Sequence, residues 1–267
     1  MTAQFSHLPV AEQNRHVIAH LTPELWSKAN RLHVRKAIAE FAHERLFTPE
    51  CVSQPTSADE MADYQLAAPQ DEVIYHFRAR RLALEHWAID ADSIQKTQNG
   101  VEQELDSLRF IIEFKDVLGI PQEMLPTYME EITSTLYSSA FKHLREGVLI
   151  EHLLEADFQT LEGAMMEGHP AFVANNGRIG FDAFDYQAYA PEAAAPINFV
   201  WLAAHKSKAH FASIDELSYQ QLLEEELTPS IVDGFTQQLI AQDLDPNNYI
   251  FMPVHPWQWQ NKLTGIF

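Results

Sequence analysis

The sequence predicts an α+β protein in which a mainly helical N-terminal region with one pair of strands precedes a mixed α/β region. Three observations support this prediction. Apolar residues recur at helical spacing in several long segments, they alternate with polar residues over 72–90, and two later apolar runs are short and β-rich. We place the boundary after residue 165, so that the two regions are 1–165 and 166–267.

The first long helix is expected to start at Thr22-Pro23-Glu24. This triplet combines a capping hydroxyl, a proline in the first turn and an acid near the positive end of the helix dipole. Apolar residues then recur at helical spacing through Phe47, and the cations among them suggest a solvated basic face: Lys28, Arg31, Arg35 and Lys36. The following segment, 49–69, is rich in Ser, Thr, Asp and Pro and is predicted to be a loop.

The period changes over 72–90. Val73, Tyr75 and Phe77 alternate with polar neighbours, which predicts one long strand or a hairpin that breaks near the basic segment 78–81. The arginines of that segment are read as exposed strand cations. The same alternation continues at Leu82, Leu84 and His86, which would extend the strand pair.

From Val101 onward the chain is predicted to be helical as far as the next loop. Three apolar stripes at helical spacing should face the core: Leu105, Leu108, Ile111, Ile112 and Leu118; Met129, Ile132, Leu136, Ala140 and Leu144; Leu153, Leu154, Phe158, Leu161 and Met165. Beyond residue 196, the segments 197–205 and 249–254 are expected to be strands. The segments 215–226 and 230–243 are expected to be helices.

Composition narrows the possible functions. The formal net charge of −20 argues against general nucleic-acid binding, which requires a basic field. No apolar run approaches the roughly 18 residues of a membrane span, and Met1–Val10 lacks the pattern of a signal peptide. The single Cys51 forms no internal disulfide, which fits a reducing compartment. Together these features predict a cytoplasmic protein without a nucleic-acid or membrane partner.

The segment 167–181 is the strongest candidate for a functional site. Gly168 and Pro170 end the preceding helical run, and Gly177 gives the backbone freedom to approach a ligand closely. His169 and Arg178 stand near the two ends of the loop, and a planar guanidinium suits phosphate or carboxylate. Such a loop is well suited to bind an anionic group. The alternative is a helix cap followed by a hairpin, with both side chains solvated or bonded to backbone carbonyls.

Three stretches together resemble the IucA/IucC family of siderophore synthetases that act independently of nonribosomal peptide synthetases. The first is the loop, in which Gly168, His169, Pro170, Arg178, Gly180 and Phe181 match the family's Gly-His-Pro…Lys-x-Arg-x-Gly-Phe pattern. The others are Phe-Val-Trp-Leu-Ala-Ala-His-Lys at 199–206 and Met-Pro-Val-His-Pro-Trp-Gln-Trp at 252–259. Two positions depart from the pattern: Phe172 replaces a second His of many members, and Asn176 replaces the Lys.

The resemblance is nearest to the branch that makes hydroxamate siderophores of the desferrioxamine, putrebactin and alcaligin kind. It implies an acid–amine ligase that uses ATP and Mg²⁺. A carboxylate such as an N-hydroxy-N-succinyl-diamine would form an acyl-adenylate, which an amine then attacks. The residues that would take part fall into three groups: catalytic His169 and Arg178; nucleotide-binding His169, Asn175, Asn176, Gly177, Arg178 and Lys206; and substrate-binding His255. No protein metal ligand is assigned, and a homodimer is expected.

The resemblance also implies a thumb-like helical region and a fingers-like α/β region. A palm-like C-terminal domain and a Ser-x-Arg-Thr element, both present in family members, are missing from this sequence. We therefore expect a truncated form that is inactive alone. Two alternatives remain: a non-catalytic ligand-binding fragment, and a metal-dependent hydrolase that uses His169, His205, His210 and His255. The hydrolase has no His-Glu-x-x-His to support it.

Overall fold

The computed structural model describes residues 17–53, 57, 60–70, 72–144, 150–165 and 167–266. The chain divides into two compact units, Met1–Ala195 and Pro196–Phe267, and each is considered by itself below. The boundary predicted after residue 165 falls within the first unit. The expectation for Met1–Val10 concerns residues outside the described part of the chain.

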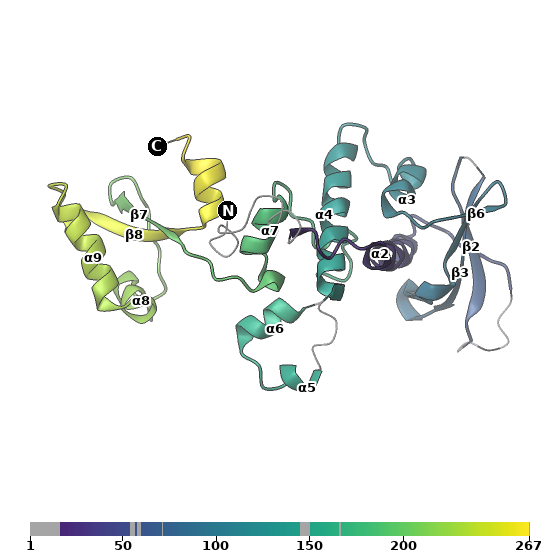
Figure 1. The fold of residues 1–267 in the computed structure, drawn as a ribbon, viewed down its shortest axis with the longest axis horizontal. Coiled ribbons are helices and arrows are strands. Elements are labelled where there is room, and N and C mark those ends of the chain that lie inside the picture. Colours follow the sequence, from purple (N-terminus) through teal and green to yellow (C-terminus); the bar gives the residue numbers. More distant parts are fainter. Residues whose placement is uncertain are drawn as a thin grey trace. The chain divides into compact units, whose positions relative to one another are not determined.

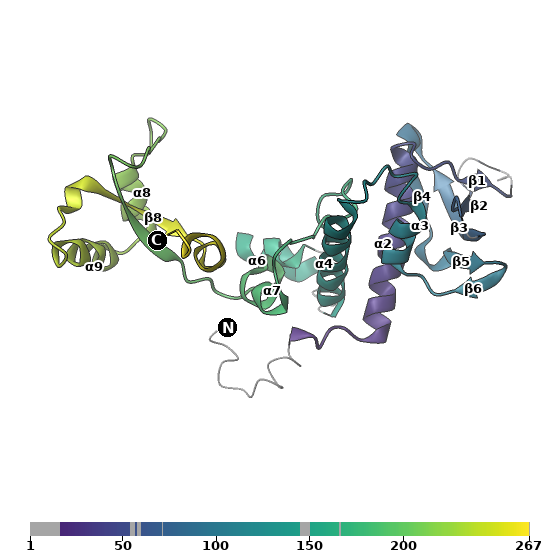
Figure 2. The ribbon, with the colours of Figure 1, turned by 90° about the horizontal axis from the view of Figure 1, so that it is seen from above.

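Helix α2 (Pro23–His43) begins where the sequence predicts. The Thr22 side chain accepts a hydrogen bond of 3.3 Å from the Leu25 backbone N–H, and Pro23 occupies the first turn. The helix ends at His43, four residues before the predicted end at Phe47. Its buried face contains Ala29, Val34 and Ile38. The helix lies between the sheet and α4 (Figures 1 and 2).

The first unit contains a six-stranded antiparallel sheet, larger than the predicted strand pair. The strands are β1 (Glu50–Cys51), β2 (Ala62–Ala67), β3 (Val73–Arg81), β4 (Trp87–Ile89), β5 (Gln95–Gln98) and β6 (Val101–Gln103). Their order is β1-β2-β3-β5-β6, and β4 pairs with the other end of β3. The predicted loop over 49–69 is wrong, because it contains β1 and β2.

The composition around β2 predicted a loop and not a strand. Its buried residues, Ala62, Tyr64 and Leu66, alternate with polar ones, but only over six positions. Pairing with β3, Tyr64 opposite Phe77, stabilises it. The long β3 itself follows the predicted alternation. The predicted continuation through Leu84 is wrong: Leu84 is 82% exposed with φ of 58°, inside the 3₁₀ turn η1 (Ala83–Glu85).

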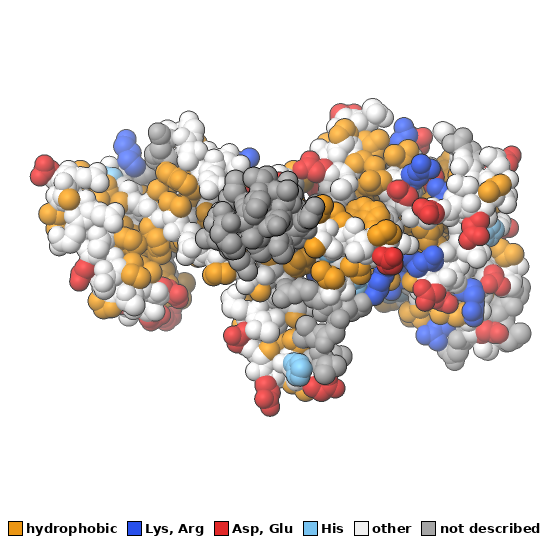
Figure 3. Space-filling model, in the orientation of Figure 1, with side chains coloured by type: hydrophobic (Ala, Val, Ile, Leu, Met, Phe, Trp, Pro, Cys, Tyr) orange, Lys and Arg blue, Asp and Glu red, His pale blue; other side chains and the backbone are white. Residues whose placement is uncertain are grey.

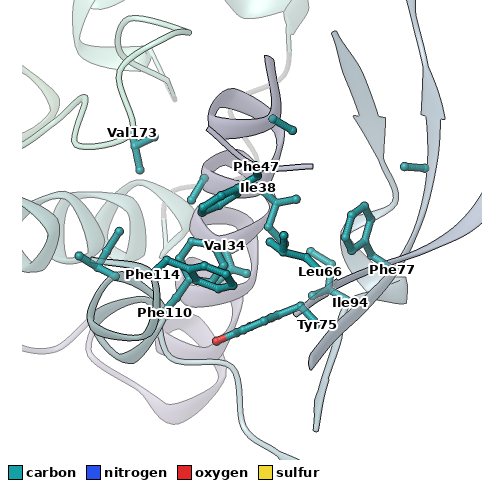
Figure 4. Packing of buried hydrophobic residues seen from close by; sticks show 14 of the residues in the cluster. Val34, Ile38, Phe47, Leu66, Tyr75, Phe77, Ile94, Phe110, Phe114 and Val173 are labelled. Carbon is teal, nitrogen blue, oxygen red and sulfur yellow. The ribbon is translucent and has the colours of Figure 1, made fainter. Parts of the chain in front are cut away.

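Two further helices, α3 (Ser107–Phe114) and α4 (Leu125–Leu144), complete the core of the first unit. Phe110 and Phe114 of α3 pack on Tyr75 of β3, with ring centroids 5.1 and 5.9 Å from the tyrosine ring (Figure 4). Ile132, Leu136 and Ala140 of α4 are fully buried, as their spacing predicts. The predicted helix from Val101 begins only at Ser107, and Ile112 is exposed.

One ion pair lies at the edge of this core. Lys96 of β5 is 2% exposed, and its Nζ donates a 2.5 Å hydrogen bond to Glu113 Oε1 on α3. The Tyr75 hydroxyl donates a 2.6 Å hydrogen bond to the other oxygen of the same carboxylate. The pair thereby links the sheet to α3 with both charged groups satisfied.

The third predicted stripe does not form a buried face. The segment is divided into two short helices, α5 (Ile150–Leu153) and α6 (Phe158–Ala164), and Met166 lies outside the described residues. Leu154 and Phe158 are 80% and 69% exposed. Helical spacing identifies an apolar face, but burial requires an opposing surface, which the described residues of this unit do not supply.

The segment after the candidate loop contains α7 (Ala183–Tyr189) and the 3₁₀ turn η3 (Pro191–Ala193). A capping box formed by Asp182 and Asp185 starts α7. Tyr186 of α7 and Glu192 of η3 are buried against α4, where both contact Ser138. These elements bring residues of the candidate site together.

The second unit is built on a two-stranded antiparallel sheet, β7 (Val200–His205) with β8 (Tyr249–Val254). Both strands were predicted. Helices α8 (Tyr219–Glu226) and α9 (Pro229–Ile240) occur within or near the predicted ranges. After β8 come α10 (Pro256–Gln258) and a short π-helical segment, Trp259–Leu263.

On the face shown in Figure 3, acidic side chains lie between the basic ones over the sheet-bearing part of the first unit. Of the β3 arginines predicted to be exposed strand cations, Arg78 and Arg81 are exposed, whereas Arg80 is half-buried. No helix of the described chain is long and apolar enough to cross a bilayer.

Candidate functional site

Glycines allow the loop 167–181 to fold back on itself and on α4. A Cβ at Gly168 would lie 2.5 Å from the backbone oxygen of Asn175, well inside any normal contact. A Cβ at Gly177 would lie 3.0 Å from the Glu131 backbone oxygen. Position 168 therefore requires glycine because of close backbone approach, and Gly177 packs tightly on the α4 backbone; its predicted approach to a ligand stays a prediction.

The middle of the loop is fixed to the hydrophobic core. Val173 is 5% exposed and belongs to the same buried cluster as Val34 and Ile38 (Figure 4). On the α4 side, the Arg178 backbone N–H donates to Ser134 Oγ at 3.0 Å, and the Gly180 backbone N–H donates to Glu130 Oε1 at 3.2 Å. The loop is therefore a supported part of the first unit, and the predicted alternative of a hairpin is not observed.

Lys36 of α2 reaches the start of the loop. Its Nζ donates to the His169 backbone oxygen at 3.1 Å and lies 3.7 Å from Glu167 Oε2. Its side chain is only 11% exposed, so the prediction that Lys36 belongs to a solvated basic face is wrong. Burial lowers the pKa of this ammonium group, whereas the nearby Glu167 and Glu40 act in the opposite direction.

Arg178 forms the strongest polar contact of the site. Its Nη1 and Nη2 donate to the two carboxylate oxygens of Glu192, each at 2.9 Å. Glu192 Oε1 also accepts hydrogen bonds from the hydroxyls of Tyr186, at 2.6 Å, and Ser138, at 2.8 Å. The guanidinium carbon lies 5.3 Å from the centroid of the Tyr186 ring. Neither solvation nor bonding to backbone carbonyls describes this arginine.

The buried carboxylate of Glu192 stays ionised in this setting. Burial alone would raise its pKa, but hydrogen bonds from Tyr186 and Ser138 and the charge of Arg178 bring the pKa below the ordinary value of 4.5. Burial beside this carboxylate in turn raises the pKa of the Tyr186 hydroxyl well above its usual range. The tyrosine is therefore a hydrogen-bond donor to Glu192 throughout the physiological pH range.

Arg178 keeps hydrogen-bonding capacity beyond this ion pair. A guanidinium has about five N–H donors, of which the Glu192 pair uses two. The arginine also lines a cavity of about 300 Å³, whose wall includes Ser134, Tyr137 and the carboxylates of Glu130 and Asp182. A cation held rigidly at the wall of a cavity can bind an anionic group without reorganising.

His169 is exposed at the start of the loop. Its Nδ1 accepts a 3.2 Å hydrogen bond from the Ala171 backbone N–H, so the neutral ring carries its proton on Nε2. The ring lies 4.5 Å from the Phe172 ring, between centroids. This geometry leaves Nε2 on the ring edge opposite the turn, where it can donate to a ligand.

The two asparagines of the loop are half-buried. Asn175 Nδ2 lies 3.4 Å from Glu167 Oε2 and 3.5 Å from the His169 oxygen, distances at the limit for hydrogen bonds. Asn176 Nδ2 donates to Asn175 Oδ1 at 3.2 Å. The side-chain hydrogen bonds of both asparagines are thus made to other residues of the loop, and they shape the turn that carries His169 and Arg178.

Two buried groups of the site were missed by the sequence analysis. Lys142 of α4 is 4% exposed and Glu192 of η3 is 5% exposed. A signal for Lys142 existed: Ser134, Ser138 and Lys142 are spaced four apart and share one helix face. No signal marked Glu192, because its role depends on the path of the chain through α7.

Lys206 and His255 belong to the second unit. Lys206 is exposed just after β7, and its backbone N–H donates to the Asn248 oxygen at 2.8 Å. His255 caps α10, since its Nδ1 accepts a 3.1 Å hydrogen bond from the Trp257 N–H, and its ring lies 6.5 Å from that of Phe199. The structure thus groups His169, Asn175, Asn176, Gly177 and Arg178 in one unit, and Lys206 with His255 in the other.

The histidines invoked for a hydrolase also divide between the units. His169 is in the first; His205, His210 and His255 are in the second. Within the described part of the chain, no group of three or more His, Cys, Asp or Glu side chains could hold a metal ion. The described residues therefore give the hydrolase alternative no support.

Comparison with known proteins extends this picture. Residues 157–267 match the IucA / IucC family. The putrebactin synthase of Shewanella sp. (strain MR-4) is 43% identical over 265 residues, which cover 99% of this chain and 41% of the synthase. The rhizobactin siderophore biosynthesis protein RhbF of Rhizobium meliloti (strain 1021) is 30% identical, over 91% of this chain and 39% of that protein.

Solved structures give the same result for the fold. The aerobactin synthetase IucC from a hypervirulent pathotype of Klebsiella pneumoniae superposes with a TM-score of 0.77 at 27% identity, over 90% of this chain and 42% of that chain. The petrobactin biosynthesis protein AsbB from Bacillus anthracis str. Sterne superposes with a TM-score of 0.76 at 23% identity, over 97% of this chain and 42% of that one, which supports the fold alone.

The fold and the loop define a mixed α/β protein of the class found in siderophore synthetases. The chain spans about two fifths of the length of the curated relatives that it matches. Its residues 157–267 match the IucA/IucC family, and nearly the whole chain is similar to siderophore synthetases, as the loop and the two later motifs predicted.

Proposed function

We propose that this chain is the part of an ATP-dependent siderophore synthetase that holds the phosphates of the nucleotide. The observation that carries the proposal is the Arg178–Glu192 pair. It fixes a guanidinium, by two hydrogen bonds of 2.9 Å, at the wall of a cavity of about 300 Å³. The names of similar proteins, which include putrebactin synthase and aerobactin synthase, support the same class of reaction.

In the proposed reaction, ATP activates a carboxylate as an acyl-adenylate with release of pyrophosphate. An amine then attacks the activated carbonyl, and the amide forms with release of AMP and a proton. The task of the first unit is to position and neutralise the phosphates. Arg178 offers its remaining N–H donors and His169 offers its Nε2–H, whereas the Gly177 N–H, which donates to the Ala174 oxygen at 3.2 Å, would have to exchange that bond for a phosphate oxygen. Asn175 and Asn176 keep the turn in shape. These donors suit a polyphosphate, because they combine charge with fixed directions.

Mg²⁺ is part of the proposal. This ion keeps several water ligands and is usually bound through substrate phosphates and one or two carboxylates. It therefore does not require a dedicated cluster of protein ligands, and we assign it no residue of this chain.

The remaining features of the proposed enzyme follow from the resemblance to the family. The helical region would serve as a thumb and the α/β region as fingers, with Lys206 at the nucleotide and His255 at the substrate. The substrates would be a succinylated hydroxamic acid and an amine. The whole protein would be a cytoplasmic homodimer that also contains a palm-like domain.

The phosphate role of Arg178 can be tested in a chimera that joins this chain to the remaining part of the Shewanella putrebactin synthase. Arg178→Ala should lower kcat/KM for ATP by about two to three orders of magnitude, typical for loss of one charged stabilising group. Arg178→Lys should restore little, because the fork that binds Glu192 is lost. An Arg178→Ala variant that keeps kcat/KM within a factor of about two would refute the role.

Glu192→Gln provides the matched test of positioning. It keeps the shape of the side chain but removes the charge that orients Arg178, so KM for ATP should rise more than kcat falls. A second experiment concerns the isolated chain, for which we expect only background ATP–pyrophosphate exchange. Robust exchange by the isolated chain would contradict the proposal that the missing region is needed. Binding of ATP without exchange in the chimera would favour the non-catalytic alternative.

A further inference from the structure

Lys142 is a buried cation that the proposed site has not yet used. It lies in the last turn of α4 and is 4% exposed. Ser134 and Ser138, one and two turns earlier, bond to the Arg178 backbone and to Glu192. Residues spaced four apart share a helix face, so Lys142 continues the face of α4 that meets the loop and η3.

The carboxylates around Lys142 are engaged elsewhere. Both oxygens of Glu192 accept hydrogen bonds from Arg178, and one of them also accepts from two hydroxyls. Glu167 lies against Lys36 and Asn175. In the described part of the chain, Glu192 and Glu167 are the carboxylates that act on the Lys142 ammonium, and both are bonded to other donors. A lysine that is 4% exposed keeps its charge at a cost in free energy, which a bound anion would offset.

Two further cations act on Lys142. Burial lowers the pKa of its ammonium; Glu192 and Glu167 oppose the shift, while Arg178 and Lys36 reinforce it. Lys142, Arg178 and Lys36 thus act on one another in this region. Three cations gathered in a chain with a formal net charge of −20 are what binding of an anion requires.

A purely structural role explains these observations less well. A lysine in the last turn of a helix interacts favourably with the helix dipole, but it can do so while solvated. Burial beneath a loop, beside two other cations, adds cost without adding stability. That combination is common at functional sites, where binding groups are kept at the expense of stability.

We propose that Lys142 is an anion-binding group beneath the loop 167–181 and that its ligand is a phosphate group. The inference rests on the proposed function, because it assigns the phosphate to the same loop that presents His169 and Arg178. It adds a cation from α4 to a site otherwise built from the loop. Lys142 would bind as a point charge, whereas Arg178 provides directed donors.

The experiment uses the chain itself, with inorganic pyrophosphate as the probe. Binding is measured by titration calorimetry, and the melting temperature is measured without ligand. Lys142→Met keeps a side chain of similar length without the charge. We expect it to weaken pyrophosphate binding at least tenfold while leaving the melting temperature unchanged or higher. Lys208→Met, which removes an exposed lysine, should leave both within error.

Several results would overturn the inference. They are unchanged pyrophosphate binding by Lys142→Met, absence of binding by the unmodified chain, or a melting temperature several degrees lower in both Lys142→Met and Lys142→Gln. The last result would show a structural cation. Binding of succinate, but not of pyrophosphate, with the same dependence on Lys142 would overturn the phosphate assignment.

Arg178→Ala, measured in parallel, separates this inference from the proposed function. Loss of pyrophosphate binding in Lys142→Met but not in Arg178→Ala supports Lys142 and refutes the phosphate role of Arg178. The opposite pattern refutes the role of Lys142 and leaves the proposed function standing.

Discussion

The first unit contains two buried lysines in opposite situations. Lys96 and Lys142 are 2% and 4% exposed. Lys96 is bound by Glu113, whose other oxygen accepts from Tyr75, so every charge at that edge of the core is matched. Lys142 lies beside carboxylates that are engaged with other donors. The two lysines are therefore equally buried but serve different purposes. Lys96 joins two elements of the fold, whereas Lys142 belongs to the site in which we propose that an anion binds.

The largest expected effect tests this contrast directly. Lys96→Met would leave Glu113 without its cation, and breaking a buried pair from one side costs about 3 kcal/mol, at the low end because Glu113 keeps some exposure to water. Lys142→Met should cost nothing or stabilise the unit. Urea unfolding followed by circular dichroism measures both. Equal losses in the two variants would remove the distinction between them.

Lowering the pH should reduce the folding stability of the first unit through the buried His33. Burial, with a smaller contribution from Lys36, lowers the pKa of His33 to about 4 from an ordinary value of 6.5. Because the folded pKa lies below the unfolded one, the unfolded chain binds more protons between pH 6.5 and 4. Stability is therefore complete above pH 6.5 and is lost as the pH falls towards 4.

For His33 the loss between pH 7 and 5 should be about 2 kcal/mol. Burial also lowers the pKa of His20 to about 4, so it adds a contribution of the same sign. His33→Gln should reduce the slope of stability against pH in this window. Urea midpoints measured across the range provide the comparison, and an unchanged slope in the variant would count against a neutral His33.

The loop 167–181 can be perturbed by adding a side chain where two of its backbone segments lie close together. Gly168→Ala places a methyl group 2.5 Å from the Asn175 backbone oxygen, so the loop must move, at a cost of about 1–3 kcal/mol. Gly234→Ala is the matched control: it lies within α9 with open space around it, and alanine there should stabilise the helix by up to about 1 kcal/mol. Thermal unfolding distinguishes the two, and equal effects would show that the loop adapts freely.

The smallest effect concerns Asn176, where family members carry Lys. Asn176→Lys adds a positive charge near Arg178, and the gain in pyrophosphate affinity should be less than about 1 kcal/mol because the group is partly solvated. The gain should shrink at high salt, which screens exposed charges. Asn176→Ser is the uncharged control. Affinity that does not change at either salt concentration would show that Asn176 only shapes the turn.

Local features of the chain were predictable where one short-range cause dominates. The start of α2 follows from Thr22 and Pro23, and β7 and β8 follow from continuous apolar runs. The β2 strand was not predictable, because its alternation is brief and its stability depends on pairing with β3. The exposed face of α5 and α6 shows the same limit, since apolar spacing does not specify an opposing surface.

The sequence by itself determined the resemblance to siderophore synthetases and the position of the candidate loop. Gly168, His169 and Arg178 occur in a motif whose residue types predict an anion site. Only the tertiary structure decided what surrounds that motif. Glu192, Lys36 and Lys142 come from η3, α2 and α4, far apart in the chain, and burial and charge between such segments are properties of packing. Partners brought together in this way leave no periodicity or spacing in the sequence, so the charge balance beneath the loop emerged only from the folded chain.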